Sequence, residues 1–370
     1  MANALTINSV ETLEQALPTI RASQEKYASF TQEQVDTICE KTAMAVSKMR
    51  IPLAKMACEE TGYGIVVDKV TKNQYASEHV WNYMRNAKTC GIIEENPAFG
   101  TKRVASPKGV IAAITPTTNP TSTTIYKIML ALKTRNAIIL SPHPHAVKCS
   151  IAAAKIMRDA AIQAGMPEHV ISWIETPTLE ISDVLMKKVD LIMATGGSGM
   201  VHAAYSSGTP AIGVGPGNCN VVIDETADLR MAVESIIHSK TFDNGMICAT
   251  EQHITVLSSV YDEVKALMKD ARCYFLNDEE AAKVAEIFFN PKNHGVKPPA
   301  VGQTATHLAE MAGITVPYDA KVLVYETNDT SHDNPWANEK LTTLLGMFRA
   351  DTLEEAFNIC AKLVYEGGAG

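Results

Sequence analysis

The stretch GVIAAITPTTN, residues Gly109–Asn119, decides the fold. Its first part, Gly109–Thr115, is a continuous apolar run, which is typical of a strand buried on both faces of a parallel sheet. Pro120–Leu132 follows with helical spacing, and Asn136–Leu140 (NAIIL) is a second buried run. This succession predicts a strand, a helix and a parallel strand at the centre of an α/β domain.

The same alternation continues along the chain. We expect helices at Ala146–Ala164 and Leu179–Lys187 and a further helix that ends near Ser206, and we expect strands at Val170–Ile174, Asp190–Ala194, Ala211–Val214 and Asn220–Ile223. A glycine-rich turn, Thr195–Gly199, joins the fourth strand to its helix. The pattern predicts a doubly wound, Rossmann-type parallel sheet.

Helices are expected before this sheet and a second α/β unit after it. Residues 10–27, 32–60 and 69–86 have helical spacing, with Thr31 as an N-cap and Pro52 as a kink or break. Two short β pieces within 96–109 form an excursion from the main body. Further strands are expected at 253–257, 323–325 and 344–349, and helices at 227–239, 259–269, 279–289, 304–312 and 353–365. We place a domain boundary near Lys240, so that residues 1–240 bind a cofactor and residues 241–370 form a catalytic domain.

Composition excludes several classes of protein. The chain has 370 residues and a net charge of -8, without a Lys/Arg-rich cluster, which argues against nucleic acid as a partner. No apolar run approaches the roughly 20 residues of a membrane span, and the N-terminus does not resemble a signal peptide. No cysteine belongs to a CxxC pair, so we read the thiols as reduced and the protein as cytoplasmic. The eight cysteines are Cys39, Cys58, Cys90, Cys149, Cys219, Cys248, Cys273 and Cys360.

Four loops are expected beyond the carboxyl ends of the strands, where open parallel sheets bind ligands. They are Ile114–Asn119, Ser141–Pro144, Gly196–Gly199 and Gly213–Asn218. The glycine-rich run after the fourth strand is either a phosphate-binding turn at a helix N-terminus or a tight strand-to-helix turn. His143 and His145 lack a third ligand at metal spacing, so we expect no metal there.

Two polar residues allow two interpretations each. Asn119 is placed either to donate its amide to a developing oxyanion or to cap the following helix. Glu339 is one of many acidic residues, and by itself it is a solvated surface charge.

Cys248 lies in TFDNGMICATEQ, Thr241–Gln252, between a helical and a strand-like segment. A thiol on a loop between rigid elements can be exposed to substrate and still be held in place. The alternative is that Cys248 is a small buried apolar side chain.

Together these stretches resemble the aldehyde dehydrogenase superfamily, and most of all the CoA-acylating half of bifunctional alcohol/aldehyde dehydrogenases. The similarity extends over essentially all of the chain. The segments that carry it are YASFTQEQVD (Tyr27–Asp36), PTTNPTST (Pro116–Thr123), LKTRNAIILSPHP (Leu132–Pro144), ATGGSGMV (Ala194–Val201), AYSSGTPAIGVGPGN (Ala204–Asn218) and KTFDNGMICATEQ (Lys240–Gln252).

The resemblance implies a role for individual residues. Cys248 matches the nucleophile that attacks the aldehyde carbon, and Asn119 with the backbone amide of Cys248 matches the oxyanion hole. Glu339 matches the carboxylate that holds the nicotinamide ribose. The other residues that match the NAD-binding segments are Ile114, Thr115, Pro116, Thr117, Thr118, Asn119, Gly197 and Gly215, with Ser141 and Pro142 near the adenosine ribose.

The way in which a thioester on Cys248 is resolved separates the enzyme classes. Hydrolytic members carry a glutamate base in an ELGG-type motif, whereas the matching stretch here, Gly213–Asn218 (GVGPGN), has no carboxylate. A thiol needs far less activation than water, so coenzyme A is the expected acceptor. The expected reaction is aldehyde, CoA and NAD giving acyl-CoA and NADH, with acetaldehyde and acetyl-CoA as the expected pair in fermentation. A hydrolytic aldehyde or semialdehyde dehydrogenase is the alternative.

The resemblance also implies segments that this chain lacks. After a glycine-rich stretch like the one at 367–370, the family continues with a histidine-containing segment, further strands and an oligomerisation hairpin. In the bifunctional enzymes an iron-dependent alcohol dehydrogenase half follows. We therefore expect a C-terminally truncated chain, with homo-oligomers and the alcohol dehydrogenase domain as partners of the full-length form. A third reading is an inactive fragment that keeps the fold or an assembly surface.

Overall fold

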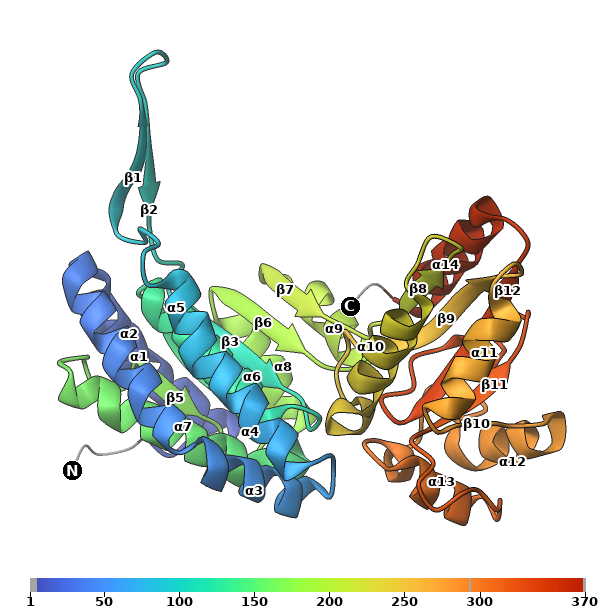
Figure 1. The fold of residues 1–370 in the computed structure, drawn as a ribbon. Helices are drawn as coiled ribbons and strands as arrows, with labels where there is room; N and C mark the ends of the chain where they lie inside the picture. Colours follow the sequence, from blue (N-terminus) through green and yellow to red (C-terminus); the bar gives the residue numbers. More distant parts are fainter. Residues whose placement is uncertain (1–4, 293, 369–370) are drawn as a thin grey trace. The chain divides into compact units, whose positions relative to one another are not determined.

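The computed structural model describes residues 5–292 and 294–368 and divides them into two compact units (Figure 1). Unit 1 holds the described residues up to Gly62 together with Val66–Val214. Unit 2 holds Tyr63–Ile65 and the described residues from Gly215 onward. Both units are α/β, as the strand and helix pattern predicts.

Unit 1 is built on a five-stranded parallel sheet with the order β5-β4-β3-β6-β7. The central strands β3 and β4 are buried along their whole length, because apolar residues occupy both faces. Their register pairs Val110 with Ala137 and Thr115 with Pro142. The strands are β3 (Val110–Thr115), β4 (Ala137–Pro142), β5 (Ile171–Trp173), β6 (Leu191–Thr195) and β7 (Ala211–Val214).

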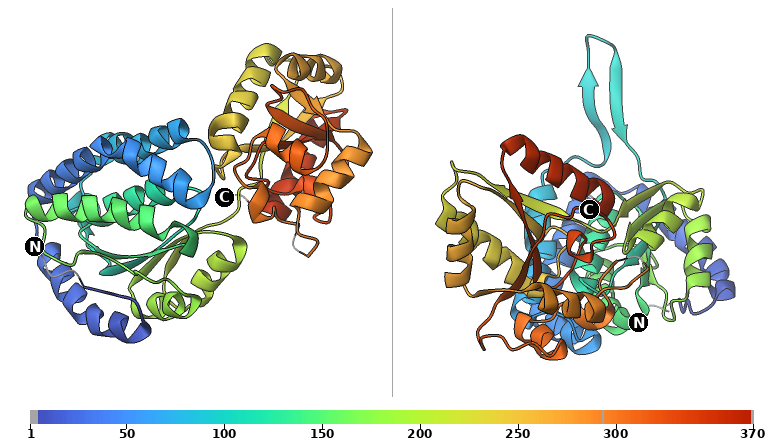
Figure 2. Two further views of the ribbon diagram at one scale, coloured as in Figure 1. Left: turned by 90° about the horizontal axis from the view of Figure 1, so that it is seen from below. Right: turned by 90° about the vertical axis from the view of Figure 1, so that its right-hand side faces the viewer.

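Helices cover both faces of this sheet, as Figure 2 shows in its left-hand view. On one face α2, α3, α6 and α7 pack against one another, and α1 and α8 pack together on the other. The helices are α1 (Val10–Ala28), α2 (Gln32–Lys48), α3 (Arg50–Thr61), α4 (Val66–Gln74), the π-helix η1 (Tyr75–His79), α5 (Val80–Met84), α6 (Pro120–Lys133), the 3-10 turn η2 (Pro144–Ala146), α7 (Val147–Gln163), α8 (Leu179–Lys188) and α9 (Ser198–Ser206).

A two-stranded antiparallel hairpin extends away from the sheet of unit 1 (Figure 1). It consists of β1 (Gly91–Asn96) and β2 (Thr101–Ala105). Almost all of its residues are exposed, including Phe99 at 79%. The expected β excursion is therefore present, and it begins a few residues earlier than the pattern indicates.

Unit 2 has its own five-stranded parallel sheet, with the order β10-β11-β12-β9-β8. Helices α10 and α11 pack together against the buried apolar residues of one face, and α14 contacts β8, β9 and β12. The strands are β8 (Cys219–Ile223), β9 (Glu251–Leu257), β10 (Cys273–Phe275), β11 (Val322–Glu326) and β12 (Leu344–Ala350). The helices are α10 (Leu229–Thr241), η3 (Phe242–Gly245), α11 (Tyr261–Asp270), α12 (Asp278–Phe288), η4 (Pro298–Ala300), α13 (Ala305–Met311), η5 (Pro335–Ala337) and α14 (Leu353–Gly367).

The structure corrects three details of the expected organisation. The units divide after Val214 and not near Lys240, because β8 pairs with β9 and therefore belongs to the second sheet. The break expected at Pro52 within residues 32–60 is present but lies at Met49, so that Pro52 falls in the first turn of α3, where a missing N–H costs nothing. The segment expected as one helix at 69–86 contains the π-helix η1.

Candidate functional site

The order of the strands in unit 1 creates a topological switch point between β3 and β6. Chain connections leave these two neighbouring strands in opposite directions, which opens a crevice at their carboxyl ends. The loop after β3 contains residues 116–119, and the loop after β6 contains residues 196–197. Two of the four expected ligand loops therefore flank the position where doubly wound sheets bind nucleotides.

Two polar features at this edge, one exposed and one buried, suit a bound anion or hydroxyl. Helix α9 begins after Gly197 without a side-chain cap, and a Cβ at Gly197 or Gly199 would meet nothing within 4 Å. Gly197, Ser198 and Gly199 are exposed, so the positive end of the helix dipole is accessible. The Thr115 hydroxyl at the end of β3 is buried and makes no hydrogen bond among the described residues. Such an orphaned donor is normally matched by a partner.

Ser141 and Pro142 form the end of β4, with Pro142 paired to Thr115. The Ser141 hydroxyl is 2% exposed and shares a 3.0 Å hydrogen bond with the Ser182 hydroxyl on α8. This hydrogen bond holds the carboxyl end of β4 against α8.

Asn119 does not play the capping role that is one of its two interpretations. It occupies the N-cap position of α6, but its side chain makes no capping bond, and Pro120 follows at the first helical position. Its amide oxygen instead accepts a 2.7 Å hydrogen bond from Lys72 Nζ on α4. Its amide nitrogen donates to the Thr118 hydroxyl at 3.2 Å.

Cys248 lies in unit 2, on a turn that follows a left-handed segment. Asp243, Asn244 and Gly245 have φ values of 50°, 54° and 74°. Asp and Asn are the side chains that tolerate this region best, so the letters DNG favour it. Asp243 accepts the Ile65 N–H at 2.7 Å, and Asn244 donates to the Gly302 carbonyl at 2.8 Å. The Cys248 side chain is half-buried, as a reactive thiol on a loop requires.

Gly217 connects Cys248 to Glu339. Its N–H donates to Glu339 Oε1 at 2.9 Å. A Cβ at this position would lie 2.1 Å from the Cys248 carbonyl oxygen and 3.2 Å from the Cys248 Cβ. Only glycine therefore allows the chain to pass this close to the Cys248 loop. The Cys219 thiol also contacts that carbonyl, at 3.3 Å.

Burial shapes the charges next to this group. It raises the pKa of Glu339 to about 7, against the opposing effects of the Gly217 N–H and of Lys240 and Lys340. It lowers the pKa of Lys240 to about 7, and Lys240 Nζ donates to Gln252 Oε1 at 3.1 Å. The interpretation of Glu339 as a solvated surface charge is therefore wrong, because burial dominates its pKa. Its ionisation falls in the physiological range.

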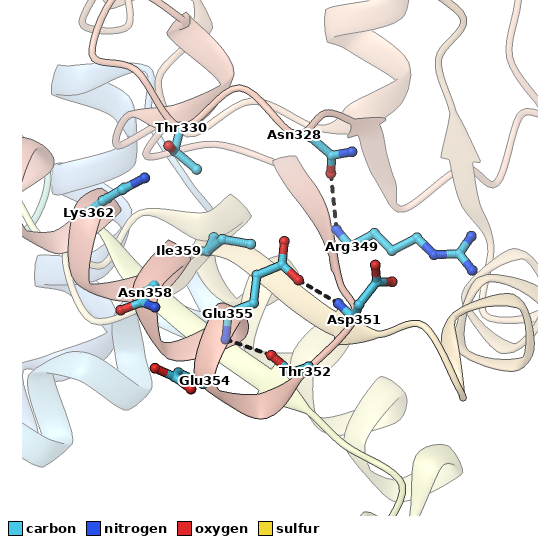
Figure 3. A pocket seen from close by; sticks show the side chains of 10 residues that line it. All are labelled: Asn328, Thr330, Arg349, Asp351, Thr352, Glu354, Glu355, Asn358, Ile359 and Lys362. Carbon is cyan, nitrogen blue, oxygen red and sulfur yellow. Dashed lines mark hydrogen bonds between the residues drawn. The ribbon is translucent and has the colours of Figure 1, made fainter.

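Unit 2 also contains a pocket with a volume of about 630 Å³, which Figure 3 shows. Polar side chains around the start of α14 line it, but Cys248 and Glu339 do not. Its polar groups largely hold one another: Thr352 accepts the Glu355 N–H at 3.1 Å, and Glu355 accepts the Asp351 N–H at 2.8 Å. We read it as a capped helix start.

The predicted residues thus fall into two groups. Ile114, Thr115, Pro116, Thr117, Thr118, Asn119, Ser141, Pro142 and Gly197 lie at the carboxyl edge of the sheet in unit 1, and Gly215, Cys248 and Glu339 lie in unit 2. The structure adds Gly217, Lys72 and Lys240. Gly217 belongs to the GVGPGN run and Lys240 opens the segment KTFDNGMICATEQ, whereas Lys72 lies in none of the quoted segments. Among the described residues, no cluster of three or more His, Cys, Asp or Glu could hold a metal, and no helix is long and apolar enough to cross a membrane.

The model of the aldehyde dehydrogenase family matches residues 4–280. The chain belongs to this family. It is 48% identical to the aldehyde-alcohol dehydrogenase of Clostridium acetobutylicum over 98% of its own length and 42% of that relative, so it spans about two fifths of the longer protein. A crystal structure of an acetylating aldehyde dehydrogenase from Geobacillus thermoglucosidasius is 44% identical, with a TM-score of 0.93 over 97% of this chain and 79% of that one.

A more distant structural neighbour has a ligand. The propionaldehyde dehydrogenase of Rhodopseudomonas palustris, solved with bound propionyl-CoA, is 26% identical. Its TM-score is 0.84, over 98% of this chain and 79% of that one. The expected family and fold are confirmed by these comparisons.

Proposed function

We propose that the chain carries the site of a CoA-acylating aldehyde dehydrogenase, in which aldehyde, CoA and NAD give acyl-CoA and NADH through a thioester on Cys248. The observation that carries this proposal is the junction at Gly217, where the backbone joins the carboxylate of Glu339 to the loop of Cys248. The acetylating activity named for the Geobacillus relative supports it, because this chain spans most of that protein.

The first step needs a thiolate and a place for negative charge. The Cys248 thiolate adds to the aldehyde carbon, and the carbonyl oxygen becomes the oxyanion of a tetrahedral hemithioacetal. The backbone N–H of Cys248 and the Nδ2 group of Asn119 are the proposed donors to that oxygen. One donor of this kind is worth about 10²–10³-fold in rate. The role of Asn119 rests on the family resemblance, since Asn119 belongs to unit 1.

The residues at the carboxyl edge of unit 1 fit a dinucleotide. The uncapped N-terminus of α9 would hold its phosphates, and the orphaned hydroxyl of Thr115 offers a partner for another polar group of the cofactor. Glu339 would accept hydrogen bonds from the nicotinamide ribose. When NAD is bound, it supplies the acceptor for the hydride that the hemithioacetal carbon loses as the thioester forms.

The acceptor of the acyl group is the thiol of CoA. Water needs a general base to attack a thioester, and the stretch Gly213–Asn218 has no carboxylate to serve as one. A thiol is partly ionised near neutral pH and is the stronger nucleophile. The propionyl-CoA bound to the Rhodopseudomonas neighbour supports this choice.

The properties of the longer relatives belong to the same proposal. They are an associated alcohol dehydrogenase domain, a homo-oligomer, a cytoplasmic location and acetaldehyde with acetyl-CoA as the substrate pair. Each rests on resemblance to proteins of which this chain spans about two fifths.

A coupled assay tests the proposal. The chain is mixed with acetaldehyde and NAD, with and without CoA, and NADH and acetyl-CoA are measured in the same sample. We expect the two products in equal amounts and no continued NADH formation without CoA. Free acetate formed without CoA would favour the hydrolytic alternative. No NADH, together with equal labelling of Cys248 and the other cysteines, would favour a chain that keeps the fold alone.

A further inference from the structure

Lys72 determines which way the side-chain amide of Asn119 points. A lysine ammonium has donors and no acceptor, so the 2.7 Å contact with Lys72 Nζ requires the oxygen of the amide to face α4. The NH₂ group is then forced to the opposite side. One of its protons goes to the Thr118 hydroxyl at 3.2 Å, and the other has no acceptor among the described residues. The amide is therefore presented as a donor.

Residues on one face of helix α4 form hydrogen bonds with the segment from Thr118 to Thr121. Lys69, Lys72 and Asn73 have the spacing i, i+3 and i+4, which places them side by side. Lys69 Nζ donates to the Thr118 carbonyl at 3.2 Å. The Asn73 side chain accepts the Thr121 hydroxyl at 2.8 Å and anchors itself on the Arg50 carbonyl at 3.1 Å.

The contact with Lys72 also changes the amide chemically. A cation on the oxygen of an amide polarises it and makes the N–H protons stronger donors. A charge-assisted bond is about twice as strong as a neutral one, so it also restricts rotation of the side chain. Both effects favour donation to an anion.

We infer that Lys72 is a positioning residue for the reaction at Cys248: it orients and polarises the Asn119 amide so that the Nδ2 group donates to the hemithioacetal oxyanion. This inference rests on the proposed function. Lys72 acts through Asn119 and does not need to touch substrate itself.

A double-mutant cycle tests the inference in the full chain. Lys72→Met, Asn119→Ala and the double variant are compared with the wild type by the rate at which p-nitrophenyl acetate acylates Cys248, followed on the tryptic peptide that contains it. Acylation passes through an oxyanion and does not require NAD. We expect Lys72→Met to slow acylation about tenfold and Asn119→Ala about a hundredfold. The double variant should match Asn119→Ala, because Lys72 has nothing left to orient.

Several controls separate the possible causes. Alkylation of Cys248 by iodoacetamide forms no oxyanion and should be unchanged in Lys72→Met. Lys72→Arg, which keeps a cationic donor, should remain within about threefold of the wild type. Lys48→Met removes an exposed lysine of the same unit and should have no effect. Circular dichroism and thermal unfolding establish that each variant is folded.

The outcomes are distinct. Equal acylation of wild type and Lys72→Met, or a double variant slower than Asn119→Ala, overturns the inference. Wild-type Cys248 that is acylated no faster than the other cysteines contradicts the proposed function instead. In that case a crystal structure still tests the position of Lys72. The inference requires Lys72 Nζ to lie within hydrogen-bond distance of Asn119 Oδ1. A lysine directed elsewhere overturns the inference.

Discussion

The loops of Cys248 and Asn119 are held in different ways. The Cys248 turn is fixed by backbone: left-handed residues precede it, and Gly217 passes so close that a Cβ would overlap the Cys248 carbonyl. The Asn119 loop is fixed by side chains, with Lys69 and Lys72 donating to Thr118 and Asn119. We therefore expect the first loop to be sensitive to added atoms and the second loop to the loss of charged donors.

Replacing Cys248, the proposed nucleophile, is expected to have the largest effect. Cys248→Ala should abolish formation of acyl-CoA and NADH while NAD affinity stays nearly constant, because the substitution removes one sulfur from a half-buried position. Assays of turnover and of NAD binding by fluorescence measure both. Cys360→Ala, which removes another half-buried thiol of unit 2, is the matched control and should retain turnover. Simultaneous loss of turnover and NAD binding in Cys248→Ala would mean that the residue is structural.

Gly217→Ala tests the backbone-held loop. The new Cβ would lie 2.1 Å from the Cys248 carbonyl oxygen, so either the Cys248 turn or the segment around Gly217 must shift. A displacement of about 1 Å at a reacting group costs on the order of a hundredfold in rate, and overpacking costs about 1–3 kcal/mol of stability. Turnover and urea unfolding measure these losses. Gly199→Ala meets open space and should leave both the stability and Cys248 alkylation unharmed. Wild-type turnover in Gly217→Ala would contradict the view that the close approach of Gly217 fixes the Cys248 loop.

The pH dependence of NAD affinity tests Glu339. Burial raises the pKa of this carboxyl to about 7, so it is mostly protonated at pH 6 and mostly ionised at pH 8. In the proposed role only the carboxylate can accept both ribose hydrogen bonds, so the affinity for NAD should rise up to about tenfold across this interval. Calorimetric titration with NAD at several pH values measures it. Glu339→Gln should give a weaker and flatter profile. A steep profile in that variant would assign the effect to Lys240 or Lys340.

The same pKa shift has a consequence for folding. In the unfolded chain the Glu339 carboxyl loses its proton near its ordinary pKa of 4.5, whereas the folded chain keeps it up to about pH 7. The folded state therefore binds more protons in this interval, and the contribution of Glu339 to stability falls as the pH rises from about 4.5 to about 7. Urea unfolding at pH 5 and pH 7 should show a smaller fall in Glu339→Gln than in the wild type. An equal fall in both proteins would contradict this assignment.

Ser182→Ala should have the smallest effect. It removes the 3.0 Å hydrogen bond to the buried Ser141 hydroxyl, and loss of one neutral bond costs about 1 kcal/mol. We expect this decrease in the free energy of unfolding, measured with urea, and no change in Cys248 alkylation. A decrease in alkylation would show that the side-chain contacts of unit 1 control the thiol, contrary to the comparison.

The fold was largely predictable because its central strands are continuous apolar runs. Val110–Thr115 and Ala137–Pro142 are buried throughout, and their apolar residue types predict this burial. The strand β10 was missed because three residues carry too little pattern. The domain boundary was misplaced because strand pairing, here β8 with β9, is not visible in local sequence.

The site was predictable only in part, for a physical reason of the same kind. The residues DNG before Cys248 favour a left-handed turn, and a glycine indicates a position where another part of the chain can pass close to the backbone. The contact of Lys72 with Asn119 joins residues that are 47 positions apart, and a lysine on an amphipathic helix has no distinguishing signal. The raised pKa of Glu339 likewise depends on burial that only the folded chain creates.

Trapping the thioester tests the central claim most directly. The chain is incubated with acetaldehyde and NAD in the absence of CoA, digested with trypsin at low pH, and examined by mass spectrometry. The account predicts one acetyl group on the peptide that contains Cys248, and its transfer to CoA when CoA is added before digestion. An acetyl group on other cysteines, or its release as free acetate at the same rate with and without CoA, would contradict the account.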